Sequence, residues 1–144
     1  MIYILARTGS YTQLSLLLAI WLSIAVNAVI DLLGHSRSEK PVRTMLTHSV
    51  FTAPVWGGAI GVASILVPLT VLNLPLEWDL TLLSLGLGVL VAITHLVLDV
   101  FTQNGIYYGR RRIALTHLSY NNAILNLVFV ALGLILVASA FLGF

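Results

Sequence analysis

The chain has 144 residues, of which 59% are apolar and only 8% are charged, with a net charge of +2 and a mean hydropathy of +1.03. Soluble domains carry about 25% charged residues, so a water-soluble fold could not cover its surface with so few. The small net charge argues against a nucleic-acid-binding surface. The absence of cysteine excludes disulfides and thiolate metal ligands. This composition predicts a polytopic integral membrane protein.

Four apolar stretches each reach the roughly 20 residues that a helix needs to cross hydrocarbon. They run from Tyr11 to Leu33, Val50 to Leu72, Leu80 to Phe101 and Ala123 to Phe144. The first is longer than the core of a signal peptide, which is about 7 to 15 residues, so we expect it to be retained. We therefore predict one all-α transmembrane domain over residues 1–144. Pro54 and Pro68 predict a bend in the second helix.

The charges of the short connectors predict the orientation of these helices. The basic residues are Arg37, Lys40 and Arg43 in the first connector and Arg110, Arg111 and Arg112 in the third. The second connector carries only Glu77 and Asp79. Because short cytoplasmic loops are enriched in Lys and Arg, the first and third connectors should face the cytoplasm of a cell-membrane protein. Both termini should then lie outside, with Arg7 as the one exception to the charge rule.

Polar residues gather near the predicted cytoplasmic ends of the helices. His95 and Asp99 are four positions apart and share one face of the third helix, where Ser84, Gly88, Ala92 and Thr102 extend a small and polar seam. On the first helix, Ser23, Asn27 and Asp31 form a matching stripe. An Asp at the centre of a membrane helix costs about 3 kcal/mol. Each Asp therefore needs a cation, an ion pair or a proton.

The pattern R-x-x-L-T-H occurs twice, from Arg43 to His48 and from Arg112 to His117. Asp31 precedes the first histidine by 17 positions, and Asp99 precedes the second by 18. These spacings predict two parallel helix-loop-helix repeats, related by an axis along the membrane normal, with the histidines at the starts of the second and fourth helices. The alternative is that Thr-His after a basic loop simply caps and anchors a helix.

Imidazole and carboxylate together suit zinc, iron, manganese or magnesium, and a site with open positions activates water or polarises a phosphoryl oxygen. The candidate ligands for one or two such metal ions are Asp31, His48, His95, Asp99 and His117. The alternative for each histidine is an interfacial hydrogen-bonding residue.

Further residues flank these candidate ligands. We expect Arg43 and Arg112 either to hold a substrate phosphate or to act as lipid-headgroup anchors. Asn27, Thr102 and Asn121 are candidates for hydrogen bonds to the ligands, with interhelical hydrogen bonds as the alternative. Asn27 should orient Asp31 or a water molecule. His35 follows Gly34, a helix-ending residue, and is assigned to a loop.

At these residues the sequence resembles the predicted membrane-bound metal-dependent hydrolases, most closely an archaeal branch of that family. The matching segments are Asp31, P-V-R-T-M-L-T-H-S from Pro41 to Ser49, H-L-V-L-D-V-F-T-Q-N-G-I from His95 to Ile106, and R-R-R-I-A-L-T-H-L-S-Y-N-N from Arg110 to Asn122. The resemblance implies a membrane hydrolase whose His and Asp residues bind a divalent metal.

We therefore predict a metal-dependent hydrolase that acts on an amphiphilic, phospholipid-like phosphoester at the cytoplasmic leaflet. Membrane lipid is the expected partner, and a homo-oligomer is compatible with the sequence. Two alternatives stay open. Intramembrane Asp and His also mark ion or proton transporters, and the histidines could instead be structural in a non-enzymatic assembly protein.

Overall fold

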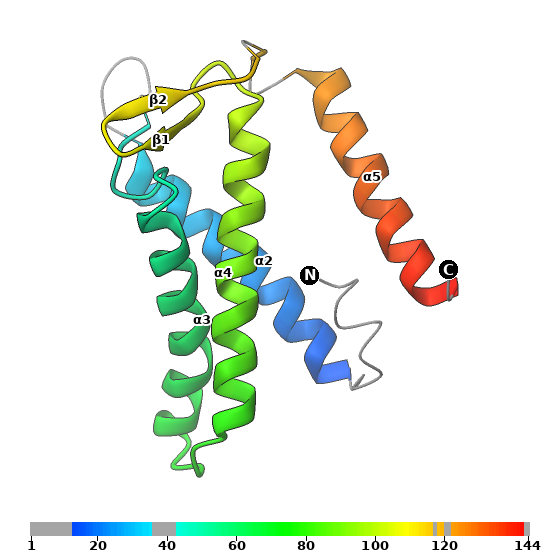
Figure 1. The fold of residues 1–144 in the computed structure, drawn as a ribbon. Coiled ribbons are helices and arrows are strands. Elements are labelled where there is room, and N and C mark those ends of the chain that lie inside the picture. The colour runs from blue at the N-terminus through cyan, green and yellow to red at the C-terminus, as the bar shows by residue number, and fades with distance from the viewer. Residues whose placement is uncertain (1–12, 36–42, 117, 120–121, 143–144) are drawn as a thin grey trace.

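The computed structural model describes residues 13–35, 43–116, 118–119 and 122–142. This part of the chain is mostly helical and contains four helices (Figure 1). They are α2 (Gln13–Gly34), α3 (Thr52–Val71), α4 (Trp78–Val100) and α5 (Ala123–Leu142). Their bounds lie within two residues of the four apolar stretches. The predicted all-α character is thus confirmed for the bulk of the described chain.

Small residues bring α3 and α4 into close contact along their length. A Cβ atom on Gly57 would lie 2.3 Å from the Gly88 carbonyl oxygen, and one on Gly88 would lie 2.1 Å from that of Gly57. The Ser84 hydroxyl donates to the Gly61 carbonyl oxygen at 2.7 Å. Side chains larger than these could not fit between the two backbones. The small-residue seam predicted on the third helix is therefore confirmed as a close helix contact.

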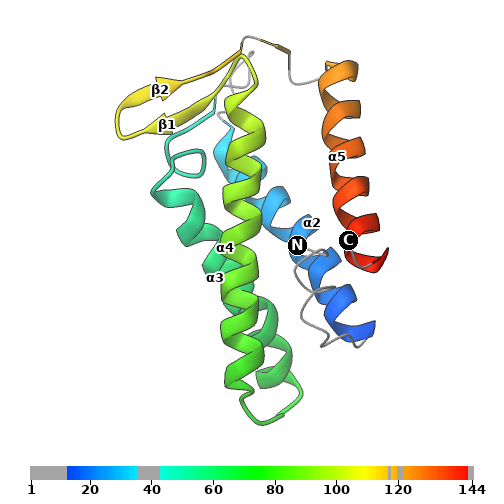
Figure 2. The same ribbon diagram turned by 45° about the vertical axis from the view of Figure 1, so that its right-hand side comes forward.

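The helix α2 packs against both α3 and α4, whereas α5 stands apart from them (Figure 1), as the turned view also shows (Figure 2). The contact between α2 and its neighbours buries an apolar core of Val26, Ile30, Ala53, Val91, Ala92 and Leu96. Within the described residues, α5 makes no extensive contact with another helix. Its Phe129 ring lies 5.8 Å from that of Phe101 at the end of α4.

The turn between α3 and α4 lies at the opposite end of these helices from the other connectors (Figure 1). It begins with Asn73 in the left-handed region at φ 52°. The Asn73 and Leu74 amides donate to the carbonyl oxygens of Thr70 and Leu69. This is the Schellman arrangement, which satisfies the last carbonyls of a helix.

The third connector, predicted as a simple loop, contains an antiparallel hairpin of β1 (Ile106–Tyr108) and β2 (Arg111–Ile113). Gly109 takes φ 59° at the first turn position, a conformation that glycine adopts without strain. The hairpin also forms backbone hydrogen bonds with the first connector. The Tyr107 amide donates to the His48 carbonyl oxygen at 2.8 Å, and the Val50 amide donates to that of Tyr107 at 3.0 Å.

Two further expectations need correction. The helix α3 begins at Thr52, so His48 lies in the turn before it and does not start the helix. Pro54 falls in the first turn of α3, where its missing amide hydrogen breaks no helical hydrogen bond, so only Pro68 could bend the helix. His117, expected to start the fourth helix, lies outside the described residues.

Candidate functional site

Four of the five predicted ligand residues meet near the hairpin end of the helices. Asp31 comes from α2, His48 from the turn before α3, and His95 and Asp99 from α4. Nε2 of His48 lies 3.6 Å from Oδ1 of Asp31 and 3.5 Å from Oδ2 of Asp99. Nε2 of His95 lies 3.5 Å and 3.2 Å from the same two oxygens. We call Asp31, His48, His95 and Asp99 the histidine–carboxylate cluster.

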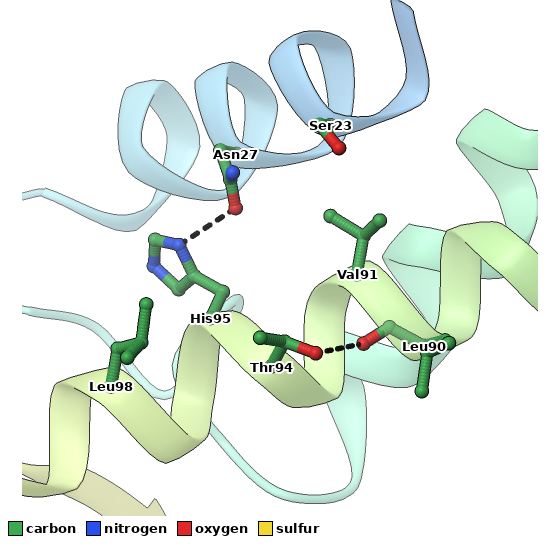
Figure 3. Close-up of a pocket in the computed structure, with 7 residues that line it drawn as sticks. All are labelled: Ser23, Asn27, Leu90, Val91, Thr94, His95 and Leu98. Carbon is green, nitrogen blue, oxygen red and sulfur yellow. Dashed lines mark hydrogen bonds between the residues drawn. The ribbon is translucent and has the colours of Figure 1, made fainter. Parts of the chain in front are cut away.

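The other nitrogen of each imidazole ring is held by a hydrogen bond. Nδ1 of His95 donates to the side-chain oxygen of Asn27 at 2.9 Å, as the close-up shows (Figure 3). Thr47 donates its hydroxyl hydrogen to the Ile30 carbonyl oxygen, so its oxygen accepts from Nδ1 of His48 at 3.0 Å. With hydrogen on Nδ1, each ring turns its Nε2 towards the carboxylates.

These converging atoms are buried and lack hydrogen bonds. Within the described chain, Nε2 of His48, Nε2 of His95 and Oδ2 of Asp99 have no hydrogen-bond partner. The His48 side chain is fully buried and that of Asp99 is 9% exposed, whereas that of Asp31 is 50% exposed. Unsatisfied buried polar atoms cost about 1 to 3 kcal/mol each, and these three can be satisfied either by ion pairs between protonated rings and the carboxylates or by a shared cation.

Asp99 is anchored by Arg43, which the sequence analysis did not pair with it. Nη2 of Arg43 donates to Oδ1 of Asp99 at 2.6 Å, and Nη1 donates to the Thr102 hydroxyl at 2.7 Å and to the Gly105 carbonyl oxygen at 3.1 Å. Burial lowers the pKa of the Arg43 guanidinium below its usual value, and the Asp99 carboxylate opposes part of that decrease. The pair leaves Oδ2 of Asp99 directed at the two histidines.

His35 is a neighbour of the cluster that sequence reasoning placed only in a loop. Its Nδ1 donates to the Asp31 carbonyl oxygen at 2.7 Å, and its ring meets that of His48 edge-on with centroids 5.3 Å apart. Its spacing of four residues from Asp31 was the signal for this contact. Asp31, His35 and His48 form one group of donor atoms within 4.8 Å of one another, and His48, His95 and Asp99 form another.

The remaining predicted residues are less central. Arg112 is exposed and donates to the Gln103 carbonyl oxygen at 3.2 Å. His117 and Asn121 lie outside the described residues. Asn27 orients His95, whereas we expected it to orient Asp31 or a water molecule.

A cavity of about 160 Å³ opens beside His95 between α2 and α4 (Figure 3). Besides His95, its polar lining consists of Asn27, Ser23 one turn away on α2, and Thr94 on α4. The Thr94 hydroxyl donates to the Leu90 carbonyl oxygen at 2.8 Å. The histidine–carboxylate cluster is therefore adjacent to space that extends along α4.

The fold and the cluster define a mostly helical protein with buried histidine and carboxylate groups at one end of its helices. The chain belongs to the DUF1286 family, described as "Protein of unknown function (DUF1286)", whose model matches residues 1–98. The matched region includes three members of the cluster and ends one residue before Asp99. No curated protein and no solved structure matches the chain. The hydrolase resemblance therefore stays a prediction.

Proposed function

We propose that this chain is an integral membrane protein that binds a divalent metal ion at the histidine–carboxylate cluster and hydrolyses an amphiphilic substrate at the cytoplasmic leaflet. The observation that carries this proposal is the convergence of three buried donor atoms that have no hydrogen-bond partner in the described chain. Zinc, manganese, iron and magnesium all accept ligands from this donor set.

Apolar exposure supports the membrane part of the proposal. The helices α3 and α4 are long and apolar enough to cross a bilayer. Of the 18 residues in the most apolar window of each, only 22% are buried in α3 and 39% in α4, whereas the core helix of a soluble protein is mostly buried. Large apolar side chains are exposed on every helix, among them Trp21, Ile24, Val55, Val67, Leu82, Val97, Leu127 and Leu134. Hydrocarbon would cover this surface.

A hydrogen bond from the threonine of each L-T-H segment supports the two-repeat architecture. In the first unit, the Thr47 hydroxyl donates to the carbonyl oxygen of Ile30 near the end of α2. In the second unit, the Thr116 hydroxyl donates to the carbonyl oxygen of Phe101 at the end of α4. In both units the threonine therefore bonds to a backbone carbonyl near the end of the preceding helix, one residue before Asp31 in the first unit and two residues after Asp99 in the second.

The nitrogen-to-oxygen separations in the cluster suit the ligands of a small divalent cation. Zinc takes nitrogen and oxygen ligands at about 2.0 to 2.2 Å, and a tetrahedral arrangement then separates neighbouring donors by about 3.3 to 3.6 Å. The four nitrogen-to-oxygen separations in the cluster run from 3.2 to 3.6 Å. Because Thr47 occupies Nδ1 of His48, this ring has only Nε2 left to offer. Of the two groups of donor atoms, His48, His95 and Asp99 can share one metal ion, and Asp31 is grouped with His35 and His48.

A cation held there would supply a Lewis acid that polarises a phosphoryl or acyl oxygen and activates water. The protein's own residues prepare the site. Asn27 and Thr47 set the orientation and tautomer of the two rings, a role that outer hydrogen bonds commonly have around metal ligands. Arg43 fixes the Asp99 carboxylate. Asp31 is the most exposed member, with half of its side chain accessible.

Elemental analysis of purified protein tests this proposal. We expect one equivalent of a divalent metal in the wild type and its loss in Asp99→Ala. Asp79→Ala is the matched control, because Asp79 lies in the first turn at the other end of α4, far from the cluster in sequence. Hydrolysis of phospholipid-like phosphoesters should then stop in Asp99→Ala and in the presence of a chelator. Hydrolysis that persists in both would refute the proposed reaction.

A second candidate is an ion or proton transporter, because the cavity beside His95 continues the polar lining one turn deeper to Ser23. Proteoliposomes with a pH-sensitive dye inside test it. A transporter would change the internal pH when an ion or pH gradient is imposed, and Ser23→Leu would slow that change. A metal-bound protein that turns over no substrate but moves protons would favour this candidate.

A further inference from the structure

A second cavity, of about 340 Å³, lies between α4 and α5 and reaches the cluster from the other side. Arg43, Asp99 and Thr102 line it, so the cavity meets the carboxylate that faces the two histidines. Binding sites for small molecules commonly have volumes of about 300 to 1,000 Å³. The cavity is therefore large enough for a ligand group beside the cluster.

The lining of this cavity changes from polar to apolar along the helix axes. On α4, Asp99 lies nearer the hairpin end than Leu98, and on α5, Asn126 lies nearer that end than Phe129 and Val130. The polar part is thus level with the cluster, and the apolar part begins about one turn, or roughly 5 Å, further into the bundle on α5, whereas on α4 Leu98 directly adjoins Asp99. A lipid in the bilayer has the same order, with its headgroup at the surface and its chain below.

The cavity lies on the side where the bundle is least closed. Within the described residues, α5 packs extensively against no other helix, and both ribbon views show it separated from α4 (Figure 2). Val130 lines the cavity and is still 58% exposed. An acyl chain could therefore enter sideways from the membrane without crossing water.

The net charge of the histidine–carboxylate cluster with a bound metal ion determines which lipid headgroup fits beside it. Metal-bound histidines are neutral. The carboxylates of Asp31 and Asp99, the Arg43 guanidinium and one divalent cation together leave a single positive charge. An anionic headgroup would neutralise that charge, and a buried uncompensated charge is costly.

We propose that the cavity between α4 and α5 binds an amphiphile sideways from the bilayer, with an anionic phosphate headgroup at Arg43 and Asp99 and its acyl chain against Leu98, Phe129 and Val130. This inference rests on the proposed membrane location and metal site, and it specifies the substrate class and its route. Free phosphate has the same chemistry as the headgroup, but it has no acyl chain to contact the apolar wall. The apolar wall therefore favours a lipid as the ligand of this cavity.

Photolabelling tests the inference without requiring turnover. The probe is lysophosphatidic acid with a diazirine near the carbonyl end of its chain, added to metal-loaded full-length protein in detergent micelles. We expect label on peptides that contain Leu98 or Phe129, competed by unlabelled lysophosphatidic acid and not by monoacylglycerol of the same chain length. Val130→Trp should lower the labelling about tenfold, because the indole fills the space of the chain.

Val128→Trp is the matched control, since Val128 lies on the same helix, is 49% exposed and does not line this cavity. Its labelling should equal that of the wild type. Equal labelling of both variants, label confined to other faces, or competition by inorganic phosphate as strong as by the lipid would overturn the inference. If the protein gives any of these results but still contains bound metal, the amphiphile cavity is refuted and the proposed metal site is not. Equal labelling of protein with and without metal would overturn the part of the inference in which the metal ion selects the headgroup, and the metal content of the untreated protein tests the metal site separately.

Discussion

Gly34→Ala should disturb the cluster although Gly34 is no ligand. A Cβ atom at Gly34 would lie 2.1 Å from Oγ1 of Thr47, 2.3 Å from Cε1 of His48 and 2.5 Å from Nδ1 of His48. Contacts below 3.0 Å are not tolerated, so the Thr47–His48 segment must move by nearly 1 Å. Functional groups must be held within about 0.5 Å of their working positions, so this shift should misplace Nε2 of His48.

The magnitude follows from the same contacts. Overpacking typically costs about 1 to 3 kcal/mol, against a gain of up to about 1 kcal/mol from replacing glycine by alanine in a helix. Loss of an outer hydrogen bond to a metal ligand lowers affinity about 10- to 100-fold, and the displaced Thr47–His48 pair should have an effect of that size. We therefore expect a folded protein with weaker metal binding.

Competition with a chelator of known affinity measures that effect on purified protein. The matched control is Gly86→Ala on α4, where an added Cβ atom meets no atom within 4 Å. This control should bind metal like the wild type and be slightly more stable. If Gly34→Ala bound metal as tightly as Gly86→Ala, the geometry deduced for His48 would be wrong.

Three further changes test other parts of the site. Arg43→Met should lower the free energy of unfolding by about 3 to 5 kcal/mol, measured by denaturation in detergent, because it leaves the buried Asp99 carboxylate unpaired; an unchanged midpoint would contradict this. Asn27→Ala should weaken metal binding about 10- to 100-fold without abolishing it, as titration calorimetry would show, whereas wild-type affinity would exclude an orienting role. Single cysteines at Glu77 and Arg111 should react with a membrane-impermeant thiol reagent from opposite sides, and labelling from one side would refute the proposed topology.

The sequence by itself determined the positions of the helices, because apolar length and turn-forming residues are local properties. It also predicted that His95 and Asp99 share a face, since four residues make about one helical turn. The small-residue seam on α4 was equally visible, because only glycine, alanine and serine allow backbones to approach closely.

Only the tertiary structure decided which partners these residues meet. Arg43 pairs with Asp99 across 56 positions, and Asn27 binds His95 across 68. No local rule connects residues so far apart, because their contact depends on how α2 and the first connector pack against α4. The hairpin is a similar case, because its hydrogen bond to the His48 backbone forms only when both connectors lie at the same end of the helices. Side-chain spacing along one helix is set by its periodicity, whereas the cluster is set by the packing of several helices.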